Sequence, residues 1–139
     1  MLFSTAYFPP VHFWAAALQS SQESITIEQW ENFQKQSFRN RCQIHAANGI
    51  LDLSVPIQKS NGLKQSIKDC KIGYDTDWQT LHFKSIESAY RHSPFFEFYI
   101  DDLMSFWERK ETFLLDLNLK IMETLAPLLY CPFTFNYST

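Results

Sequence analysis

The period of the hydrophobic pattern changes about midway along this chain of 139 residues. In the first part, short apolar runs and β-branched alternation, as in Ser24-Ile25-Thr26-Ile27-Glu28, predict strands. From Thr76 onward, apolar residues recur every three or four positions, which predicts amphipathic helices. We therefore expect an α/β fold with a small N-terminal sheet, parallel in part, and a C-terminal helical region packed against it.

Turn residues divide the first part into expected elements. Pro9-Pro10 ends a first strand, and Asn48-Gly49 has the composition of a tight hairpin turn. A lysine-bearing stretch before the first long helix is expected to be a solvated loop. The expected elements are strands at 2–6 and 24–28, a helix at 11–18, a hairpin of 41–45 with 50–57, and a loop at 60–73.

Three helices are expected in the second part. The first covers residues 78–90, with Asp75 and Asp77 near its N-terminus. The second covers residues 96–107, after Ser93-Pro94 as a cap and first-turn proline. The third covers residues 114–128 and contains Pro127 near its end.

Composition limits the class of protein. A chain that is 45% hydrophobic and 17% aromatic can form one globular domain over residues 1–139. The net charge is −3 and the basic residues are sparse, which argues against nucleic-acid binding. No apolar run reaches the roughly 18 to 20 residues that span a membrane. The opening segment is apolar but has no basic leader region, so we read it as mature structure.

Cysteines and histidines give no sign of a metal site. The three cysteines lie far apart, with no CxxC pair, so reduced thiols and a cytoplasmic location are expected. The histidines are too dispersed to form a recognisable ligand set, and we predict no bound metal. These residues are Cys42, Cys70 and Cys131, and His12, His45, His82 and His92.

Two guanidinium groups flank an amide at Arg39-Asn40-Arg41, shortly after Gln36. If this segment is a strand, Arg39 and Arg41 share one face and Asn40 points the other way. Planar donors on a fixed scaffold can bind a phosphate or a carboxylate, while the amides orient a second substrate. The alternative is that the arginines pair with Glu28 or Glu31.

Two histidines and two tyrosines complete the candidate site. His82 or His12 would accept a proton from an amine, and the two would cooperate if the fold brings them together. The alternative for His82 is a buried neutral ring bonded to a backbone carbonyl, because it follows Trp78 on an apolar helical stripe. Tyr7 and Tyr90 would contact substrate or pack in the core with their hydroxyls towards solvent.

Several motifs in the same order resemble the WbqC-like protein family. They are Tyr7-Phe8-Pro9-Pro10-Val11-His12-Phe13-Trp14, the segment 33–41, Asn48-Gly49 with Leu53-Ser54-Val55-Pro56, and the segment 78–90 with Ser93-Pro94-Phe95-Phe96. The resemblance covers nearly the whole chain. Similar proteins usually continue past the third helix, so we expect a single WbqC-like domain at 1–139, shortened at its C-terminus.

The resemblance implies a role in bacterial surface-polysaccharide synthesis, such as that of O-antigen. The activity it implies is a glycine transferase that attaches an aminoacyl group to an amino sugar. A small molecule or a nucleotide sugar would then be the substrate. Arg39 and Arg41 would bind its phosphate or carboxylate, and Asn40 or Gln36 would orient the acceptor.

Two other functions stay open. The layout of strand, proline loop, His12 and helix is similar to the nucleotidylyltransferase superfamily, although the glycine and first histidine of the HxGH motif are absent. That similarity implies an adenylylating enzyme that uses ATP with magnesium. The other function is a noncatalytic interaction module, or an incomplete relative, that forms a homodimer through exposed Phe133, Phe135 and Tyr137.

Overall fold

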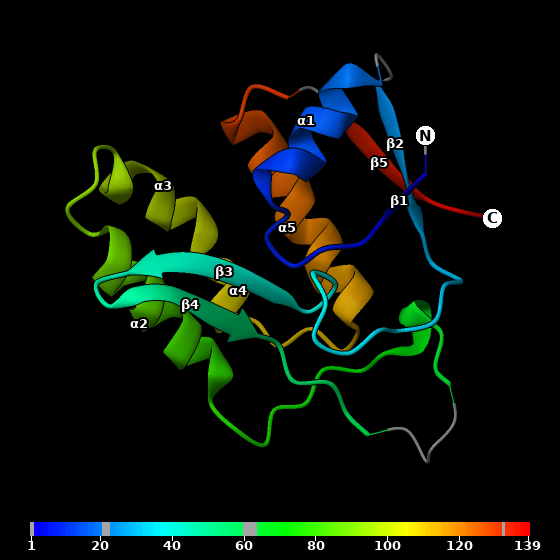
Figure 1. The fold of residues 1–139 in the computed structure, drawn as a ribbon, viewed down its shortest axis with the longest axis horizontal. Coiled ribbons are helices and arrows are strands. Elements are labelled where there is room, and N and C mark those ends of the chain that lie inside the picture. The colour runs from blue at the N-terminus through cyan, green and yellow to red at the C-terminus, as the bar shows by residue number, and fades with distance from the viewer. Residues whose placement is uncertain (1, 21–22, 60–63, 132) are drawn as a thin grey trace.

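A computed structural model describes residues 2–20, 23–59, 64–131 and 133–139 (Figure 1). It is a mixed α/β structure with strands mainly in the first half and helices in the second, as predicted. The elements are β1 (Leu2–Ser4), α1 (Val11–Gln19), β2 (Ser24–Glu28), β3 (Arg41–Ala46), β4 (Gly49–Ser54), the 3₁₀ helix η1 (Ile67–Asp69), α2 (Trp78–Tyr90), α3 (Phe96–Leu103), α4 (Ser105–Glu108), α5 (Leu114–Leu128) and β5 (Thr134–Tyr137).

The parallel sheet has three strands in the order β1-β2-β5. Its third strand comes from the end of the chain, and Ser24 pairs with Thr134. The sequence pattern does not predict β5. The expectation of exposed aromatic residues here is wrong: the alternating side chains of Phe133, Phe135 and Tyr137 are half-buried against the core beside this sheet.

Both α1 and α5 cover the same face of this sheet (Figure 1). Ile25 and Ile27 of β2 project from that face and are fully buried. They pack against Trp14 of α1 and Met122 of α5. The short loop after β1 therefore leads into a helix that crosses over the sheet to the parallel neighbour β2.

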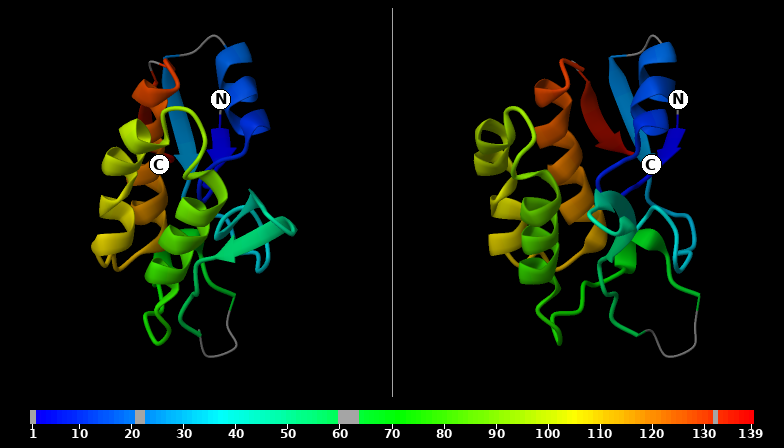
Figure 2. Two further views of the ribbon diagram at one scale, coloured as in Figure 1. Left: turned by 90° about the vertical axis from the view of Figure 1, so that its left-hand side faces the viewer. Right: turned by 60° about the vertical axis from the view of Figure 1, so that its left-hand side comes forward.

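The second part of the fold is the predicted hairpin with the helices α2, α3 and α4. Arg41 pairs with Ser54 and Ala46 with Gly49, so the expected hairpin is present, with Ala47 and Asn48 in the turn and Gly49 as the first residue of β4. Gly49 has φ of 117°, which a residue with a side chain rarely adopts. Figure 1 shows α2 behind the hairpin and Figure 2 shows the two side by side, and Ile44 of β3 faces the core that they share.

Helix boundaries differ from two of the predictions. The expected helix at 96–107 divides into α3 and α4 at Met104. The prediction that Ser93-Pro94 caps this helix is wrong. Phe95 occupies the position before α3, in a left-handed conformation with φ of 64°, and no side chain caps the helix. By contrast, the carboxylate of Asp77 accepts a hydrogen bond from the Thr80 backbone amide at the start of α2.

The expected solvated loop at 60–73 is only partly described, because residues 60–63 lie outside the described ranges. Within 64–73 the prediction is wrong: Ile67, Cys70 and Ile72 are fully buried. Isolated bridges hold this segment against Ile57 and Phe113. The lysines of this segment suggest that all of it is exposed to solvent. In the structure the long lysine side chains reach solvent, while the apolar residues between them are buried.

The buried face of α5 should dominate stability. Ile121 is fully buried, so Ile121→Ala should lower the free energy of unfolding by about 2 to 5 kcal/mol in urea denaturation. The control is Leu129→Ala, just beyond α5, where the leucine is 47% exposed. This substitution should change the free energy of unfolding by less than about 1 kcal/mol. Equal losses in the two variants would contradict the assigned core.

Candidate functional site

A groove of about 790 Å³ lies beside the start of β3 and the end of β4. None of its described lining residues is acidic, although the whole chain has a net charge of −3. Its basic residues are Lys35, Arg41, Lys59 and Lys64, and its amide residues are Gln36, Asn40, Gln58 and Gln65. The groove therefore combines positive charge with several neutral hydrogen-bonding groups.

The hairpin places Arg41 in this groove. Arg41 opens β3 and Ser54 closes β4, and the two face each other in the register. The Nε–H of Arg41 donates to Ser54 Oγ at 3.0 Å, while Nη1 lies 3.8 Å from Asp52 Oδ2. The second contact is long for a charge-assisted hydrogen bond, so much of the guanidinium charge is available to a ligand.

Asn40 and Gln36 also line the groove. Asn40 is fixed by Val55, because its Nδ2 donates to the Val55 carbonyl at 3.0 Å and its own carbonyl accepts from the Val55 amide at 2.7 Å. Its Oδ1 is buried and has no hydrogen-bond partner among the described residues. Gln36 adopts a left-handed conformation with φ of 56°. Unused polar atoms and backbone strain are both common at ligand sites.

Arg39 does not share this groove. It lies in the turn before β3, so the expectation that both arginines occupy one face of a strand is wrong. Its Nε and Nη2 donate to the two carboxylate oxygens of Glu31 at 2.7 and 3.0 Å, as the alternative predicted. This hydrogen bonding raises the pKa of the Arg39 guanidinium. Nη2 also donates to Ser4 Oγ.

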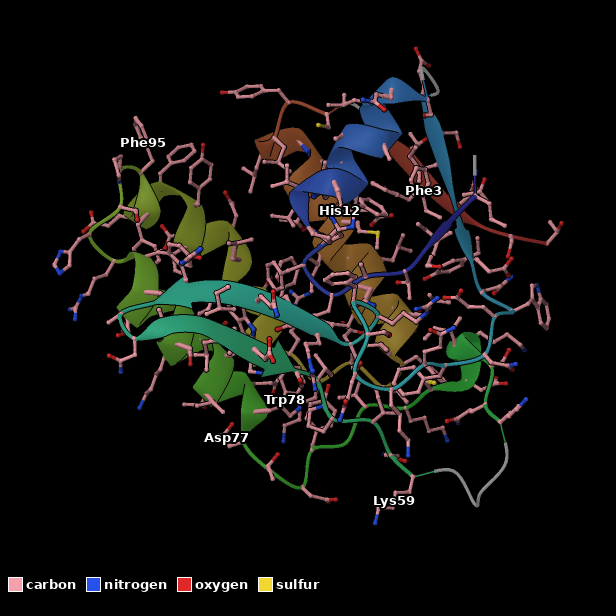
Figure 3. All side chains as sticks on the ribbon, in the orientation of Figure 1. Phe3, His12, Lys59, Asp77, Trp78 and Phe95 are labelled. Atoms are coloured by element: carbon pink, nitrogen blue, oxygen red, sulfur yellow. The ribbon has the colours of Figure 1, made fainter. Side chains whose placement is uncertain are left out.

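Arg39 instead lines a smaller cavity of about 250 Å³ with His12. This cavity lies where β1 ends and α1 begins, and Ser4 and Thr5 contribute to its wall. His12 is exposed and its ring packs edge-on against Phe38, with centroids 5.6 Å apart. Figure 3 shows His12 on α1, well separated from Lys59 of the groove.

Tyr7 and His82 meet in the core. The Tyr7 hydroxyl and His82 Nδ1 are 2.8 Å apart, and Trp107 Nε1–H donates to the same hydroxyl at 3.1 Å. Burial lowers the pKa of His82 to about 4, and burial also raises the pKa of Tyr7. The ring is therefore neutral near pH 7, with one nitrogen that donates a hydrogen bond and one that accepts.

Tyr90 lies at a fourth place, in the wall of an apolar cavity of about 320 Å³ with Phe8, Cys42 and Ile100. Its hydroxyl accepts a hydrogen bond from the His45 amide at 3.2 Å. The eight candidate residues thus divide among the groove (Gln36, Asn40, Arg41), the small cavity (His12, Arg39), the buried chain (Tyr7, His82) and this apolar cavity (Tyr90).

The sequence does not single out the other groove residues. Lys64 falls in the expected solvated loop, and Lys35, Lys59 and Ser54 have no role among the sequence-based expectations. A single lysine in a sequence gives no sign of which residues will lie beside it in the folded protein. The one available signal was that Lys59 and Lys64 belong to the basic first half of the chain, together with Arg41.

No helix in the described ranges is long and apolar enough to cross a membrane. Across residues 2–20, 23–59, 64–131 and 133–139, no group of three His, Cys, Asp or Glu side chains has the arrangement of metal ligands.

Comparison with protein families gives a match over almost the entire chain. The model of the WbqC-like protein family matches residues 5–139. The chain belongs to the WbqC-like protein family. Comparisons with curated proteins and with solved structures found no match. The matched range includes all eight candidate residues.

Burial of His82 should make the protein less stable in mild acid. The unfolded chain binds a proton at this residue near pH 6.5 but the folded protein only near pH 4, so stability falls as the pH drops through that window. We expect a loss of about 2 kcal/mol between pH 7 and pH 5, measured by urea denaturation. His82→Gln should flatten this dependence, whereas the exposed control His92→Gln should keep it. An unchanged slope in His82→Gln would contradict the buried neutral state.

Proposed function

We propose that this WbqC-like protein is a transferase of surface-polysaccharide synthesis that attaches an aminoacyl group, glycyl in the simplest case, to a nucleotide-linked amino sugar. The groove supports this proposal, because positive charge and amides converge there without an acidic neighbour among the described lining residues. Family membership supports the polysaccharide role.

The chemistry of such a substrate matches the groove wall. A nucleotide sugar carries a diphosphate, which Arg41 would bind through its planar donors and Lys59 and Lys64 as mobile charges. Its sugar hydroxyls both donate and accept hydrogen bonds. Gln36 and Asn40 would orient them, since each amide offers a donor and an acceptor.

The transfer itself moves one proton. The amine nitrogen of the sugar attacks the acyl carbonyl carbon, the bond from that carbon to its activating group breaks, and the amine releases a proton. His12 and His82 are the predicted acceptors. His12 is exposed to solvent, whereas His82 is 2% exposed and uses Nδ1 in the contact with Tyr7. Because His12 also lies in the small cavity and not in the groove, the proton goes to water in this proposal.

Ligand binding tests the groove directly. A UDP-linked amino sugar at about 100 times its dissociation constant should stabilise the protein by about 2.7 kcal/mol in thermal unfolding. Arg41→Ala should weaken binding at least tenfold in calorimetry, because it removes the planar cation from the wall. Lys84→Ala, an exposed charge on α2 outside the groove, is the control. Binding that Arg41→Ala leaves unchanged would remove the groove from the proposal.

A second candidate function rests on the small cavity. In parallel α/β sheets, ligands bind beyond the carboxyl ends of the strands, and this cavity lies where β1 ends. His12 and Arg39 in its wall would contact the phosphates of ATP, and magnesium would accompany the nucleotide as part of the substrate. The protein would then activate a carboxylate by adenylylation.

ATP with magnesium should raise the unfolding temperature if the second function holds, and His12→Ala should abolish that shift. His45→Ala, an exposed histidine on β3, is the matched control. A shift that persists in His12→Ala would exclude this cavity as the ATP site. The homodimer and the cytoplasmic location stay predictions, the first to be measured by mass at increasing protein concentration.

A further inference from the structure

We propose that a cavity between α4 and α5 binds a free α-amino acid with a short apolar side chain, in its zwitterionic form. The cavity has a volume of about 240 Å³. It shares no described lining residue with the groove or with the small cavity. The proposal therefore goes beyond the proposed function: it adds a ligand site elsewhere on the molecule and assigns no chemical step to it.

The charged groups in the wall of this cavity balance one another. Two are cationic, Arg109 and Lys120, and two are anionic, Glu111 and Glu123. Lys120 Nζ and Glu111 Oε1 lie 2.5 Å apart, so these two charges neutralise each other. Within the described ranges, neither Arg109 nor Glu123 forms an ion pair. A ligand with one carboxylate and one ammonium group can pair with both and leaves the cavity without a net charge.

The loop that carries Arg109 is held in place by hydrogen bonds. The Arg109 amide donates to the Ser105 carbonyl at 3.0 Å, and the Arg109 carbonyl accepts from Gln79 Nε2 at 2.6 Å. Gln79 is buried, so this support comes from the core. The Tyr74 hydroxyl donates to the Glu111 carbonyl at 2.6 Å. Because the backbone that carries the guanidinium is already fixed, a ligand does not have to order it on binding.

Helix α5 supplies the opposite wall. Leu117, Glu123 and Thr124 are six and seven residues apart, about two helical turns, and therefore lie on one face of α5. Leu117 and Phe106 are buried and form the apolar part of the wall. The hydroxyl groups of Ser105 and Thr124 add neutral hydrogen-bonding groups. The cavity thus combines an unpaired cation, an unpaired anion and an apolar surface within the described residues.

These groups define the ligand. The Arg109 guanidinium binds the α-carboxylate through its planar donors, and the Glu123 carboxylate accepts from the α-ammonium group. The side chain of the amino acid then packs against Phe106 and Leu117, which favours a short apolar group such as that of valine. A charged side chain is disfavoured, because the other two charged groups of the wall already pair with each other.

Titration of the full chain with L-valine tests the proposal by nitrogen-15 NMR. We expect saturable shifts of the backbone amides at 105–111 and 117–124. Arg109→Gln and Glu123→Gln should each weaken binding about tenfold, because each removes one of the two charges that pair with the zwitterion. Arg91→Gln and Glu108→Gln remove exposed charges outside the cavity and are the matched controls. The proposal is overturned if L-valine gives no saturable shifts in the wild type, or if neither cavity variant weakens binding.

Two analogues separate recognition of the zwitterion from attraction to a single charge. 3-Methylbutanoate lacks the ammonium group of valine, and 2-methylpropylamine lacks the carboxylate. Each should bind about tenfold more weakly than L-valine, and Glu123→Gln should change the affinity for 3-methylbutanoate less than about twofold, since that contact is already absent. An analogue that binds as tightly as L-valine would overturn the proposal.

A groove variant separates this site from the proposed function. Arg41→Ala should leave the affinity for L-valine unchanged, because Arg41 lines the groove and not this cavity. Loss of L-valine binding in Arg41→Ala would place the amino acid in the groove and overturn the proposal. Failure of the UDP-linked amino sugar to bind would remove the proposed function and leave this site standing.

Discussion

Burial of α5 on two sides is the interaction on which the rest of the structure depends. Leu117 and Ile121 pack into the core shared with the hairpin and α2, whereas Leu115 and Met122 pack into the core beneath the parallel sheet. One helix thus joins two hydrophobic clusters that the chain builds from different segments. Because all four side chains are at most 4% exposed, the two parts of the fold are held together by apolar burial.

Asn118 is the polar residue between these two faces of α5. It is fully buried, and its Nδ2 donates to Thr5 Oγ1 at 3.1 Å and to the Arg39 carbonyl at 2.8 Å. The segment that carries the candidate site is therefore tied to α5 at Arg39. The small cavity with His12 lies on one side of this hydrogen bond, and the groove with Arg41 lies on the other. Two cavities of different chemistry share one short segment of backbone.

This arrangement explains how an acidic chain presents a basic surface. Each of the two arginines has an acidic partner, but the distances differ. Glu31 neutralises Arg39 at close range, while Asp52 stays 3.8 Å from Arg41. Arg39 thereby stabilises the junction between β1 and the turn before β3. Arg41 retains more of its charge for the groove, where the described lysines add to it.

The sequence by itself determined the local elements and the family. Asn48-Gly49 specified the hairpin, because the glycine readily adopts the positive φ found where β4 begins, and the apolar period specified α2 and α5. Tertiary structure alone decided that 134–137 pairs with 24–27, since a four-residue strand has too little pattern to show its distant partner. It also decided that Arg39 and Arg41 separate while Lys35, Lys59 and Lys64 converge. The direction of a side chain in a turn depends on backbone angles and on neighbours remote in sequence. The spacing of residues along the chain gives no information about either.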